Sequence, residues 1–327
     1  MRIAIVRTSA LGDIIQSLVI IQFIKNKIPN AEIHWVIEDS FMEMTDYIKQ
    51  LDKAIPVSTK NINITNAPLK IFRNYKLLRS QGIYDVVIDL QGLIKSSILS
   101  SFLRTKKRVG FDRKSCRESL ASIFYNQKFS IPYHENVIYR YCELASKALK
   151  IDITKDDILA KKSIFNYKKS NSRKKYAVFI IGASFESKIY PMEKFSKVAS
   201  LINMNIIAIW NSKKEYHLGK KLVNFYPKIE LVESRNFKEL MNFISNSEIV
   251  VGGDTGPTHL AWALNIPSIT LFGSTPIERN FFNTKINHAL SSQKKINPYK
   301  INKRDFSISE ISHIDVASSI KKILKMK

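Results

Sequence analysis

The chain is poor in the residues that mark disulfide frameworks and metal sites. Its 327 residues include only two cysteines, and its six histidines are scattered. Cys116 and Cys142 match no metal-ligand spacing, and the sequence contains no Asp-x-Asp pair. These absences argue against a disulfide-stabilised secreted domain. We therefore expect a reduced, intracellular protein with no bound metal.

Long apolar runs and acidic residues are also scarce. No segment reaches the ~18–20 apolar residues of a membrane span, and the opening strand-like stretch 1–7 is too short for a signal-peptide core. There are 28 acidic residues against 52 Lys and Arg, which gives a formal net charge of +24. Such an excess attracts nucleic acid, anionic lipid or a phosphorylated glycolipid. The charge does not choose among these partners, and a general abundance of Lys, Asn and Ile accounts for it equally well.

Hydrophobic residues, 45% of the chain, form short runs that alternate with helix-like segments. Most runs are continuously apolar, which is typical of parallel strands covered on both faces. The expected strands are 2–6, 32–37, 84–89, 107–111, 176–182, 205–210, 229–232, 248–252 and 268–272. The expected helices are 13–27, 40–50, 68–81, 93–103, 135–149, 191–203, 213–225, 236–245, 257–264 and 309–326. This alternation predicts a doubly wound α/β architecture.

A polar, positively charged segment at 166–175 has the composition of a linker. We expect two Rossmann-like domains, residues 1–165 and 166–308, that face a central cleft, followed by a C-terminal helix at 309–327. Such domains bind ligands beyond the carboxyl ends of their strands. Neither half has Gly-x-Gly-x-x-Gly after its first strand, which argues against a nicotinamide-dependent oxidoreductase.

Residues 248–264 contain a candidate anion-binding turn. An apolar run leads into Gly-Gly-Asp-Thr-Gly, and Pro257 suits the first turn of a helix. Free backbone N–H groups and the positive end of the helix dipole then point at one place, which suits a phosphate or pyrophosphate. Asp254 and Thr255 stand around this place. His259 either contacts the ligand or serves the core or a helix cap.

A similar strand-to-helix turn spans residues 7–13. Asp13 falls at a helix N-terminus, where one interpretation is an N-cap. The other is a general base, because a carboxylate held by helix N–H groups stays ionised and can accept a proton from a sugar hydroxyl. Ser9 and Gly12 suit a loop that approaches a ligand closely.

Four candidates follow strands of the second half. Lys188 precedes a helix, where it either meets a pyrophosphate or is a solvated charge. Glu215 either accepts hydrogen bonds from a ribose diol or stabilises the helix dipole. Ser184 and Trp210 lie in the same two strand-to-helix junctions.

The first half offers polar and basic candidates for a second substrate. Gln91 and Lys95 follow the expected strand 84–89. Lys60 and Arg117 belong to a concentration of basic residues that suits a multiply anionic ligand. The alternative for each basic residue is that it lies on a solvated rim and binds no ligand.

The motifs and their order along the chain resemble those of the ADP-heptose:lipopolysaccharide heptosyltransferases, most closely the type I enzymes. The resemblance covers essentially the whole chain and rests on Arg7-Thr-Ser-Ala-Leu-Gly-Asp13, Asp89-Leu-Gln-Gly-Leu-Ile-Lys-Ser96, Arg117-Glu-Ser-Leu-Ala-Ser-Ile-Phe-Tyr-Asn126 and Asp254-Thr-Gly-Pro-Thr-His259. The last motif marks the wider family, and the second and third favour type I over type II.

The resemblance implies a GT-B fold, with an acceptor-binding first domain, a donor-binding second domain and a C-terminal helix that packs back toward the first. It implies inverting, metal-independent transfer of L-glycero-D-manno-heptose from ADP-heptose to the Kdo of Kdo-lipid A, without a cofactor or a nucleic-acid partner. Because the acceptor is lipid-anchored, we expect a cytoplasmic enzyme peripherally associated with the cytoplasmic face of the inner membrane.

By motif match, Asp13 corresponds to the family's general base. The donor-binding residues implied are Lys188, Glu215, Asp254, Thr255, Gly256, His259, Ser184 and Trp210. The acceptor-binding candidates are Ser9, Gly12, Gln91, Lys95, Arg117 and Lys60.

The sequence also departs from the family pattern. Asn61-Ile-Asn-Ile-Thr65 replaces the arginine run that type I relatives carry, and Ser184-Phe-Glu-Ser187 is atypical. The basic residues that hold the acceptor therefore stay open. Two alternatives remain: a type II heptosyltransferase, which adds the second heptose, and a basic polyanion-binding protein without transferase activity. No recognised nucleic-acid-binding motif supports the latter.

Overall fold

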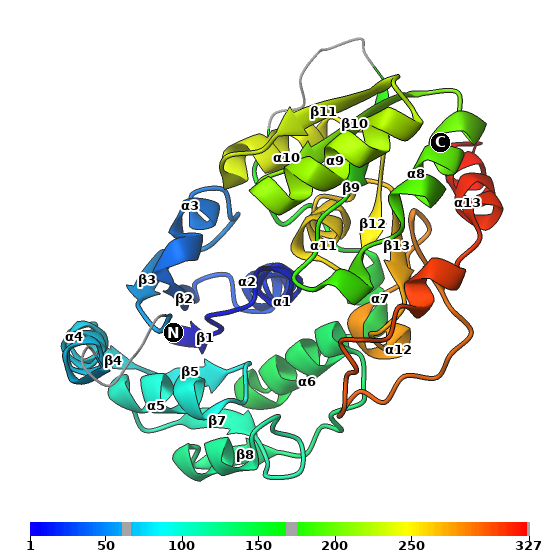
Figure 1. Cartoon of the computed structure of the whole chain (residues 1–327). Helices are drawn as coiled ribbons and strands as arrows, with labels where there is room; N and C mark the ends of the chain where they lie inside the picture. The colour runs from blue at the N-terminus through cyan, green and yellow to red at the C-terminus, as the bar shows by residue number, and fades with distance from the viewer. Residues whose placement is uncertain (61–66, 168–174, 326–327) are drawn as a thin grey trace. The chain divides into compact units, whose positions relative to one another are not determined.

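Two six-stranded sheets, one in each half of the chain, organise the structure. Figure 1 shows the computed structural model, which describes residues 1–60, 67–167 and 175–325. The departure noted at 61–65 and most of the expected linker lie outside the described residues.

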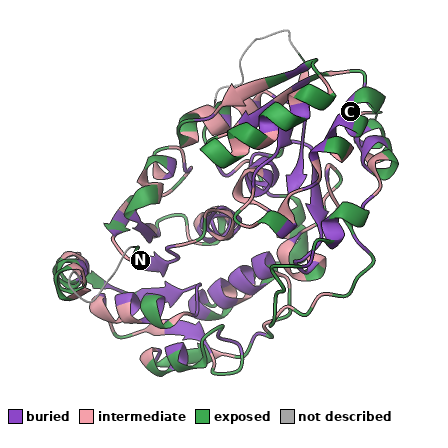
Figure 2. Ribbon diagram, in the orientation of Figure 1, coloured by how far each residue is buried: buried purple, intermediate pink, exposed green. Residues whose placement is uncertain are grey.

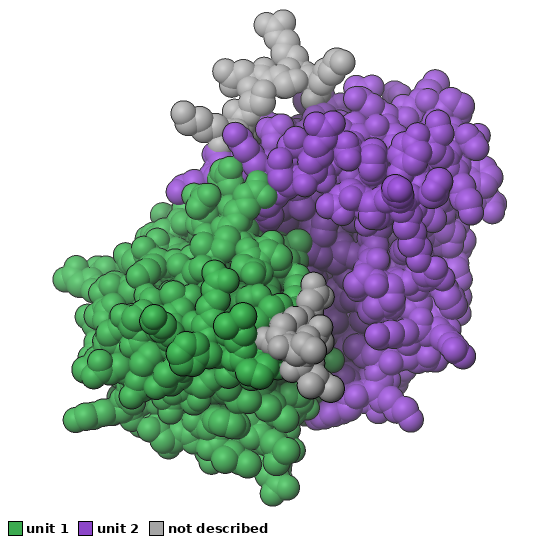
Figure 3. Space-filling view, turned by 60° about the vertical axis from the view of Figure 1, so that its left-hand side comes forward, with its two compact units in different colours: residues 1–164 green, residues 165–327 purple. Residues whose placement is uncertain are grey.

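The chain divides into two units, Met1–Ile164 and Phe165–Lys327, coloured green and purple in Figure 3. Every strand pairing in both sheets is parallel. The short runs of buried Ile and Val therefore pair as expected, and the prediction of a doubly wound α/β architecture is confirmed.

The sheet of the first unit has the order β3-β2-β1-β5-β7-β8. Its strands are β1 (Arg2–Val6), β2 (Glu32–Glu38), β3 (Lys53–Val57), β5 (Val86–Asp89), β7 (Arg108–Phe111) and β8 (Gln127–Phe129). A separate pair consists of β4 (Ile83–Tyr84) and β6 (Arg104–Thr105). The order reverses between β1 and β5, so the loops that follow these two strands form the switch point where such sheets bind ligands.

The helical segments of the first unit include a helix pair where one helix was expected. These segments are α1 (Leu11–Ser17), α2 (Val19–Lys27), η1 (Asp39–Phe41), α3 (Met42–Thr45), α4 (Ala67–Arg79), α5 (Ile94–Phe102), η2 (Ser119–Phe124), α6 (Val137–Leu149) and α7 (Lys155–Leu159). Leu18 separates α1 from α2 within the expected helix 13–27. Asn136 caps α6, because its side-chain oxygen accepts hydrogen bonds from two backbone N–H groups of the first turn.

The second unit repeats this design. Its sheet order is β11-β10-β9-β12-β13-β14, so the switch point lies between β9 and β12. The strands are β9 (Tyr176–Ile180), β10 (Asn205–Trp210), β11 (Ile229–Glu233), β12 (Ile249–Gly253), β13 (Ser268–Phe272) and β14 (Asn287–Ser291). The helical segments are η3 (Glu186–Lys188), α8 (Met192–Leu201), α9 (Lys213–Phe225), α10 (Phe237–Ser245), α11 (Gly256–Ala263), α12 (Ile277–Asn280), η4 (Ser307–Glu310) and α13 (His313–Lys325).

The C-terminal helix α13 contributes to the core of the second unit. Its apolar face, Val316, Ala317, Ile320 and Ile323, is buried in the cluster that contains strands β9 and β13. The contacts that bury this face are made with α8 and β13. The expectation that this helix packs back toward the N-terminal domain stays a prediction. Figure 2 colours most of the central strands of both sheets as buried.

No helix among the described residues is both long enough and apolar enough to span a lipid bilayer.

Candidate functional site

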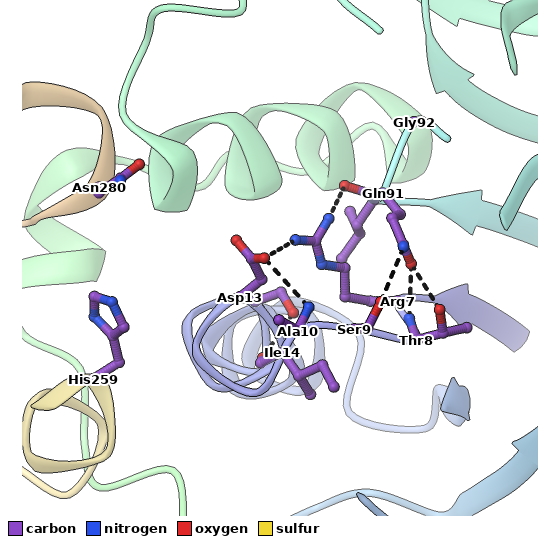
Figure 4. Close-up of polar contacts among 12 residues, drawn as sticks. Arg7, Thr8, Ser9, Ala10, Asp13, Ile14, Gln91, Gly92, His259 and Asn280 are labelled. Atoms are coloured by element: carbon purple, nitrogen blue, oxygen red, sulfur yellow. Dashed lines mark hydrogen bonds and ion pairs between the residues drawn. The ribbon is translucent and has the colours of Figure 1, made fainter. Parts of the chain in front are cut away.

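In the first unit, Asp13 lies in the first turn of α1, just beyond the switch point. Its side chain is 39% exposed, and its Oδ2 atom lies 2.9 Å from Nη2 of Arg7. The backbone N–H of Ala10 donates to the same oxygen over 3.3 Å. Figure 4 shows both contacts converging on one carboxylate oxygen. Among the described residues, Oδ1 has no hydrogen-bond or ion-pair partner.

Arg7 orients this carboxylate from a buried position. Its guanidinium donates to the backbone oxygen of Leu90 and lies over the Tyr141 ring, 5.3 Å from the ring centroid. Burial alone would lower the pKa of Arg7, but Asp13, Tyr141 and Asp89 together outweigh that effect and raise it. Arg7 therefore stays charged and fixes one edge of Asp13. Arg7 belongs to the motif 7–13, but its role could not be predicted from the sequence.

Gln91 couples the two loops of the switch point. Its side-chain oxygen accepts hydrogen bonds from the Thr8 backbone N–H over 2.9 Å and from the Thr8 hydroxyl over 3.0 Å. Its amide nitrogen donates to Ser9 over 3.5 Å, and Lys95 Nζ lies 3.3 Å from the same hydroxyl. Three acceptor-site candidates, Ser9, Gln91 and Lys95, are thus brought together in the first unit. Figure 4 shows Ser9 and Gln91 beside the Asp13 loop.

Asp89 holds the Gln91 loop in place through buried hydrogen bonds. It is fully buried and accepts hydrogen bonds from the backbone N–H of Gln91 and from the hydroxyls of Ser96 and Tyr125, at 2.8, 2.8 and 2.7 Å. Burial raises the pKa of Asp89 despite these donors. The Asp89–Tyr125 contact joins two motifs, 89–96 and 117–126, that had been treated separately in the sequence.

The remaining acceptor-site candidates are more dispersed. Lys60 follows β3; its backbone N–H donates to Glu38 over 3.0 Å and its Nζ to Ser40 over 2.8 Å. Lys95 reaches toward the same loop, with its Nζ 3.5 Å from the Thr59 hydroxyl. Gly12 is half-buried in α1, and Arg117 is exposed ahead of η2.

In the second unit, Asp254 lies at the centre of a buried polar cluster. Its side chain is 5% exposed, and Lys188 Nζ contacts Oδ2 at 2.8 Å and the Asp254 backbone oxygen at 2.9 Å. Thr275 and Asn280 donate to Oδ2 over 2.9 and 3.2 Å. His259 Nε2 lies 2.9 Å from Oδ1. Both carboxylate oxygens are therefore occupied within the protein.

The electrostatics of Asp254 follow from these partners. Burial alone would raise its pKa, but Lys188 and His259 outweigh burial and hold the pKa well below its usual range. Asp254 is therefore a permanent anion whose contacts orient Lys188 and His259. The sequence placed Asp254 among the groups around the ligand, and the structure shows that its carboxylate contacts two further candidates, Lys188 and His259.

Gly253 allows this cluster to form. A Cβ atom at this position would lie 2.1 Å from the backbone oxygen of Lys188, so only glycine lets η3 approach β12 so closely. Lys188 is thereby held at the carboxyl end of the switch-point strand, with its Nζ 5.1 Å from the Phe185 ring centroid. Two of its three ammonium donors have partners in Asp254. Within the described part of the chain the third has none, so it is available to a ligand.

Thr255 and Gly256 open helix α11 next to this cluster. Thr255 is the N-cap residue, and its backbone N–H donates to Thr258 over 3.2 Å. The Thr255 hydroxyl oxygen is buried and has no hydrogen-bond partner in the described structure. Pro257 lies at the start of the helix, as expected. The unpaired hydroxyl and the helix N-terminus both suit an anionic ligand.

Glu215 lies in the first turn of α9, in close contact with Gly182. A Cβ atom at Gly182 would lie 1.9 Å from Glu215 Oε1, and Glu215 Oε2 accepts from the Asn211 backbone N–H over 2.7 Å. The half-buried Trp210 lies at the end of β10, with its ring 5.0 Å from that of Tyr216. Ser184 is exposed in the loop after β9.

The sequence did not identify Thr275 and Asn280 as partners of Asp254. They belong to the loop after β13 and to α12, respectively. The Ser-Thr-Pro sequence that follows β13 was the available signal, because it marks another strand-to-helix turn at the same edge of the sheet. In the part of the chain that the structure describes, no group of three His, Cys, Asp or Glu side chains could hold a metal ion.

Comparison with known proteins gives consistent matches. The model of glycosyltransferase family 9 (heptosyltransferase) matches residues 71–305. Lipopolysaccharide heptosyltransferase 1 of Campylobacter coli is 37% identical to this chain, over 99% of each sequence. Its counterpart from Escherichia coli K12 is 30% identical over 84% of this chain and 88% of that protein.

Solved structures share the fold. The E. coli heptosyltransferase WaaC with ADP gives a TM-score of 0.82 at 24% identity and covers 99% of this chain and 100% of that chain. A family 9 glycosyltransferase from Veillonella parvula gives 0.81 at 16% identity, over 100% of this chain and 98% of that chain. Together with the two parallel sheets, these matches confirm the expected GT-B fold.

Proposed function

The chain belongs to glycosyltransferase family 9, and on this premise we propose that it transfers L-glycero-D-manno-heptose from ADP-heptose to the Kdo of Kdo-lipid A. Membership of this family makes it a glycosyltransferase and decides against a polyanion-binding protein without activity. The relatives named heptosyltransferase 1 support the first heptose transfer over the second. The alignment with the Campylobacter relative covers almost all of both sequences.

The observation that carries the proposal is the asymmetric environment of Asp13. Arg7 and the Ala10 N–H hold Oδ2, while Oδ1 has no partner among the described residues. A carboxylate that is oriented on one side and open on the other suits a general base. In this role, Oδ1 accepts the proton of the Kdo hydroxyl. The N-cap interpretation accounts for the Ala10 contact alone.

The proposed reaction is a direct displacement. As the hydroxyl proton passes to Asp13, the acceptor oxygen forms a bond to the anomeric carbon of heptose. The bond from that carbon to the phosphate oxygen breaks, and ADP leaves with the electron pair. Attack opposite the leaving group inverts the anomeric configuration. The chemistry requires the acceptor hydroxyl and the donor sugar to meet at Asp13.

At the donor site, the second unit stabilises the charge that builds up on the leaving phosphate. Lys188 retains one ammonium donor beyond Asp254, and helix α11 presents its N-terminus with Thr255 and Gly256. Fixed donors of this kind need no reorganisation during the reaction, so they suit metal-independent transfer. We assign the ribose to Glu215 beside Trp210. Ser184 and His259 complete the donor site.

At the acceptor site, the cluster around Ser9 binds the anionic sugar. Lys95 brings a cation to Ser9 and Gln91, directly beside the Asp13 loop. Gly12 permits close approach, and Lys60 and Arg117 add positive charge farther along the same unit. Peripheral attachment to the cytoplasmic face of the inner membrane would bring this site to a lipid-anchored acceptor.

The direct test is mass spectrometry of Kdo-lipid A after incubation with the protein and ADP-heptose, with a metal chelator present. We expect a product heavier by one heptose residue. A parallel reaction offers an acceptor that already carries one heptose, as a type II enzyme requires. Transfer only to that second acceptor would refute the assignment to type I, and loss of transfer with chelator would refute metal independence.

A further inference from the structure

Helix α4 has an exposed face that carries both large apolar and positively charged side chains. Its contacts with the rest of the first unit involve α5, and only Asn74 and Leu78 of the helix are buried. The T-shaped contact of Tyr75 with Phe102 lies at this edge, with ring centroids 5.3 Å apart. In Figure 1 the helix lies at the margin of its unit, and Figure 2 colours most of it as exposed.

Large apolar side chains project from α4 into solvent. Leu69 is 71% exposed and Phe72 is 63% exposed. Their positions relative to Asn74 place them on the opposite side of the helix, since each residue advances the direction by about 100°. These side chains therefore do not stabilise the first unit through burial. Holding them in water is unfavourable unless another surface covers them.

Positive charge occupies the same exposed face. Lys76 and Arg79 follow Leu69 and Phe72 at helical spacing, so the four side chains share one side of α4. The helix, Ala67–Arg79, contains no acidic residue. In the described structure, neither Lys76 nor Arg79 forms a hydrogen bond or an ion pair. We call these four residues the α4 surface.

We propose that the α4 surface docks the protein on an anionic phospholipid bilayer. Its cations complement the phosphate headgroups, while Leu69 and Phe72 enter the boundary between headgroups and acyl chains. The long Lys and Arg side chains keep their charges at the headgroups as the apolar groups enter. An acidic protein surface would satisfy the cations alone and would leave Leu69 and Phe72 without an apolar partner.

This inference deepens the proposed membrane association and rests on it. A lipid-anchored acceptor requires the enzyme to work at a bilayer, and the α4 surface belongs to the unit that carries the proposed acceptor site. None of its four residues contacts Asp13, Ser9, Gln91 or Lys95 in the described structure. Docking and chemistry can therefore be altered separately.

The test is sedimentation of the full chain with vesicles of phosphatidylcholine alone or mixed with phosphatidylglycerol. The charge variant is Lys76→Gln with Arg79→Gln, and the apolar variant is Leu69→Ala with Phe72→Ala. Each charge contributes about fivefold to binding at low salt. We therefore expect a roughly 30-fold loss for the first variant on anionic vesicles and, from lost apolar burial, about tenfold for the second.

Matched controls lie in the second unit. Lys220→Gln with Lys221→Gln removes the same charge from exposed positions of α9. Leu201→Ala with Phe225→Ala removes apolar side chains that are 41% and 56% exposed. Both controls should retain vesicle binding. Equal losses in controls and α4 variants, or equal wild-type binding to both vesicle types, would overturn the proposal, as would a wild-type chain that does not sediment with anionic vesicles.

Transfer to a water-soluble, deacylated Kdo acceptor separates this inference from the proposed function. The α4 variants should transfer heptose to the soluble acceptor at the wild-type rate while they lose vesicle binding. If the wild type transfers no heptose to any Kdo acceptor, the proposed function fails, and the sedimentation result still decides the docking surface. Wild-type vesicle binding by both α4 variants overturns the docking surface and leaves the enzyme assignment intact.

Discussion

Asp13 and Asp254 each follow one of the two switch-point strands of their sheet, β1 and β12, yet their surroundings differ. Each follows a strand at a switch point and stands near a helix N-terminus. Asp13 is 39% exposed and keeps one oxygen without a described partner, whereas Asp254 is 5% exposed and has donors on both oxygens. The strand–turn–helix pattern alone therefore does not define a carboxylate's role. The hydrogen-bonding capacity that the carboxylate retains defines its role.

This contrast assigns different work to the two carboxylates. A base must have a lone pair available to the substrate, and Asp13 Oδ1 meets that condition. The Asp254 carboxylate is buried and accepts four side-chain donors, so it fixes those donors in place. Asp254 is thus a positioning residue for Lys188 and His259. The following predictions test this division.

The largest effect is expected for Asp254→Ala. The substitution leaves the Lys188 ammonium group in a poorly solvated cluster without its carboxylate partner. Losing one member of a buried ion pair costs about 3–5 kcal/mol in the free energy of unfolding. Urea unfolding followed by circular dichroism would measure this loss. The exposed Glu230→Ala serves as control, and an Asp254→Ala protein as stable as that control would contradict the positioning role.

Lys188→Met comes next, because it removes one cation from the proposed donor site while preserving the length of the side chain. Loss of a hydrogen bond to a charged group costs about 1.5–3 kcal/mol, so the donor KM should rise roughly 10- to 100-fold. Steady-state kinetics with varied ADP-heptose checks this. Lys197→Met, which removes an exposed lysine paired with Glu193, is the control. An unchanged donor KM would remove Lys188 from the site.

The depressed pKa of Asp254 also predicts a pH dependence of stability. A carboxylate with a lowered folded-state pKa stabilises the protein above its unfolded pKa of about 3.9, and this contribution is lost as pH falls toward the folded value. The free energy of unfolding should therefore decline below about pH 4 more steeply for the wild type than for Asp254→Asn. Urea unfolding over this range measures the difference. Parallel curves would show that the Lys188 and His259 contacts do not stabilise the ionised form.

The smallest effect is expected for Gly182→Ala. The new Cβ would meet Glu215 Oε1 at 1.9 Å and displace that side chain from its present position. Loss of one hydrogen bond to the ribose corresponds to about 2- to 10-fold weaker donor binding. Calorimetric titration with ADP measures the change. The control is the double variant Gly182→Ala with Glu215→Ala. If Gly182 acts through Glu215, the losses of ADP affinity in the two single variants should not add in the double variant.

Much of the fold and the position of the site could be predicted from local patterns. Continuous apolar runs predicted nine of the strands because central parallel strands are buried on both faces. The edge strands β3, β8 and β14 were missed. They carry polar or only partly buried residues, and β3 contains Pro56, which is tolerated at an edge. Strand-to-helix turns at 7–13 and 254–259 located the candidate sites for the same topological reason.

The partners of each carboxylate could not be predicted, because they come from distant parts of the sequence. Thr275 and Asn280 reach Asp254 across 21 and 26 residues, respectively. The Asp89–Tyr125 hydrogen bond spans 36 residues. Local spacing carries no information about such contacts. For that reason the sequence could place Asp254 in the candidate site but could not identify the side chains that surround its carboxylate.

The most direct test of the account is turnover and ADP affinity measured together for Asp13→Asn. The amide preserves the shape of the side chain but cannot take up the hydroxyl proton. We expect transfer to fall by about 10²- to 10⁴-fold, with ADP binding equal to that of the wild type. Transfer at a near-normal rate would contradict the account, because the open oxygen of Asp13 would then have no part in the chemistry.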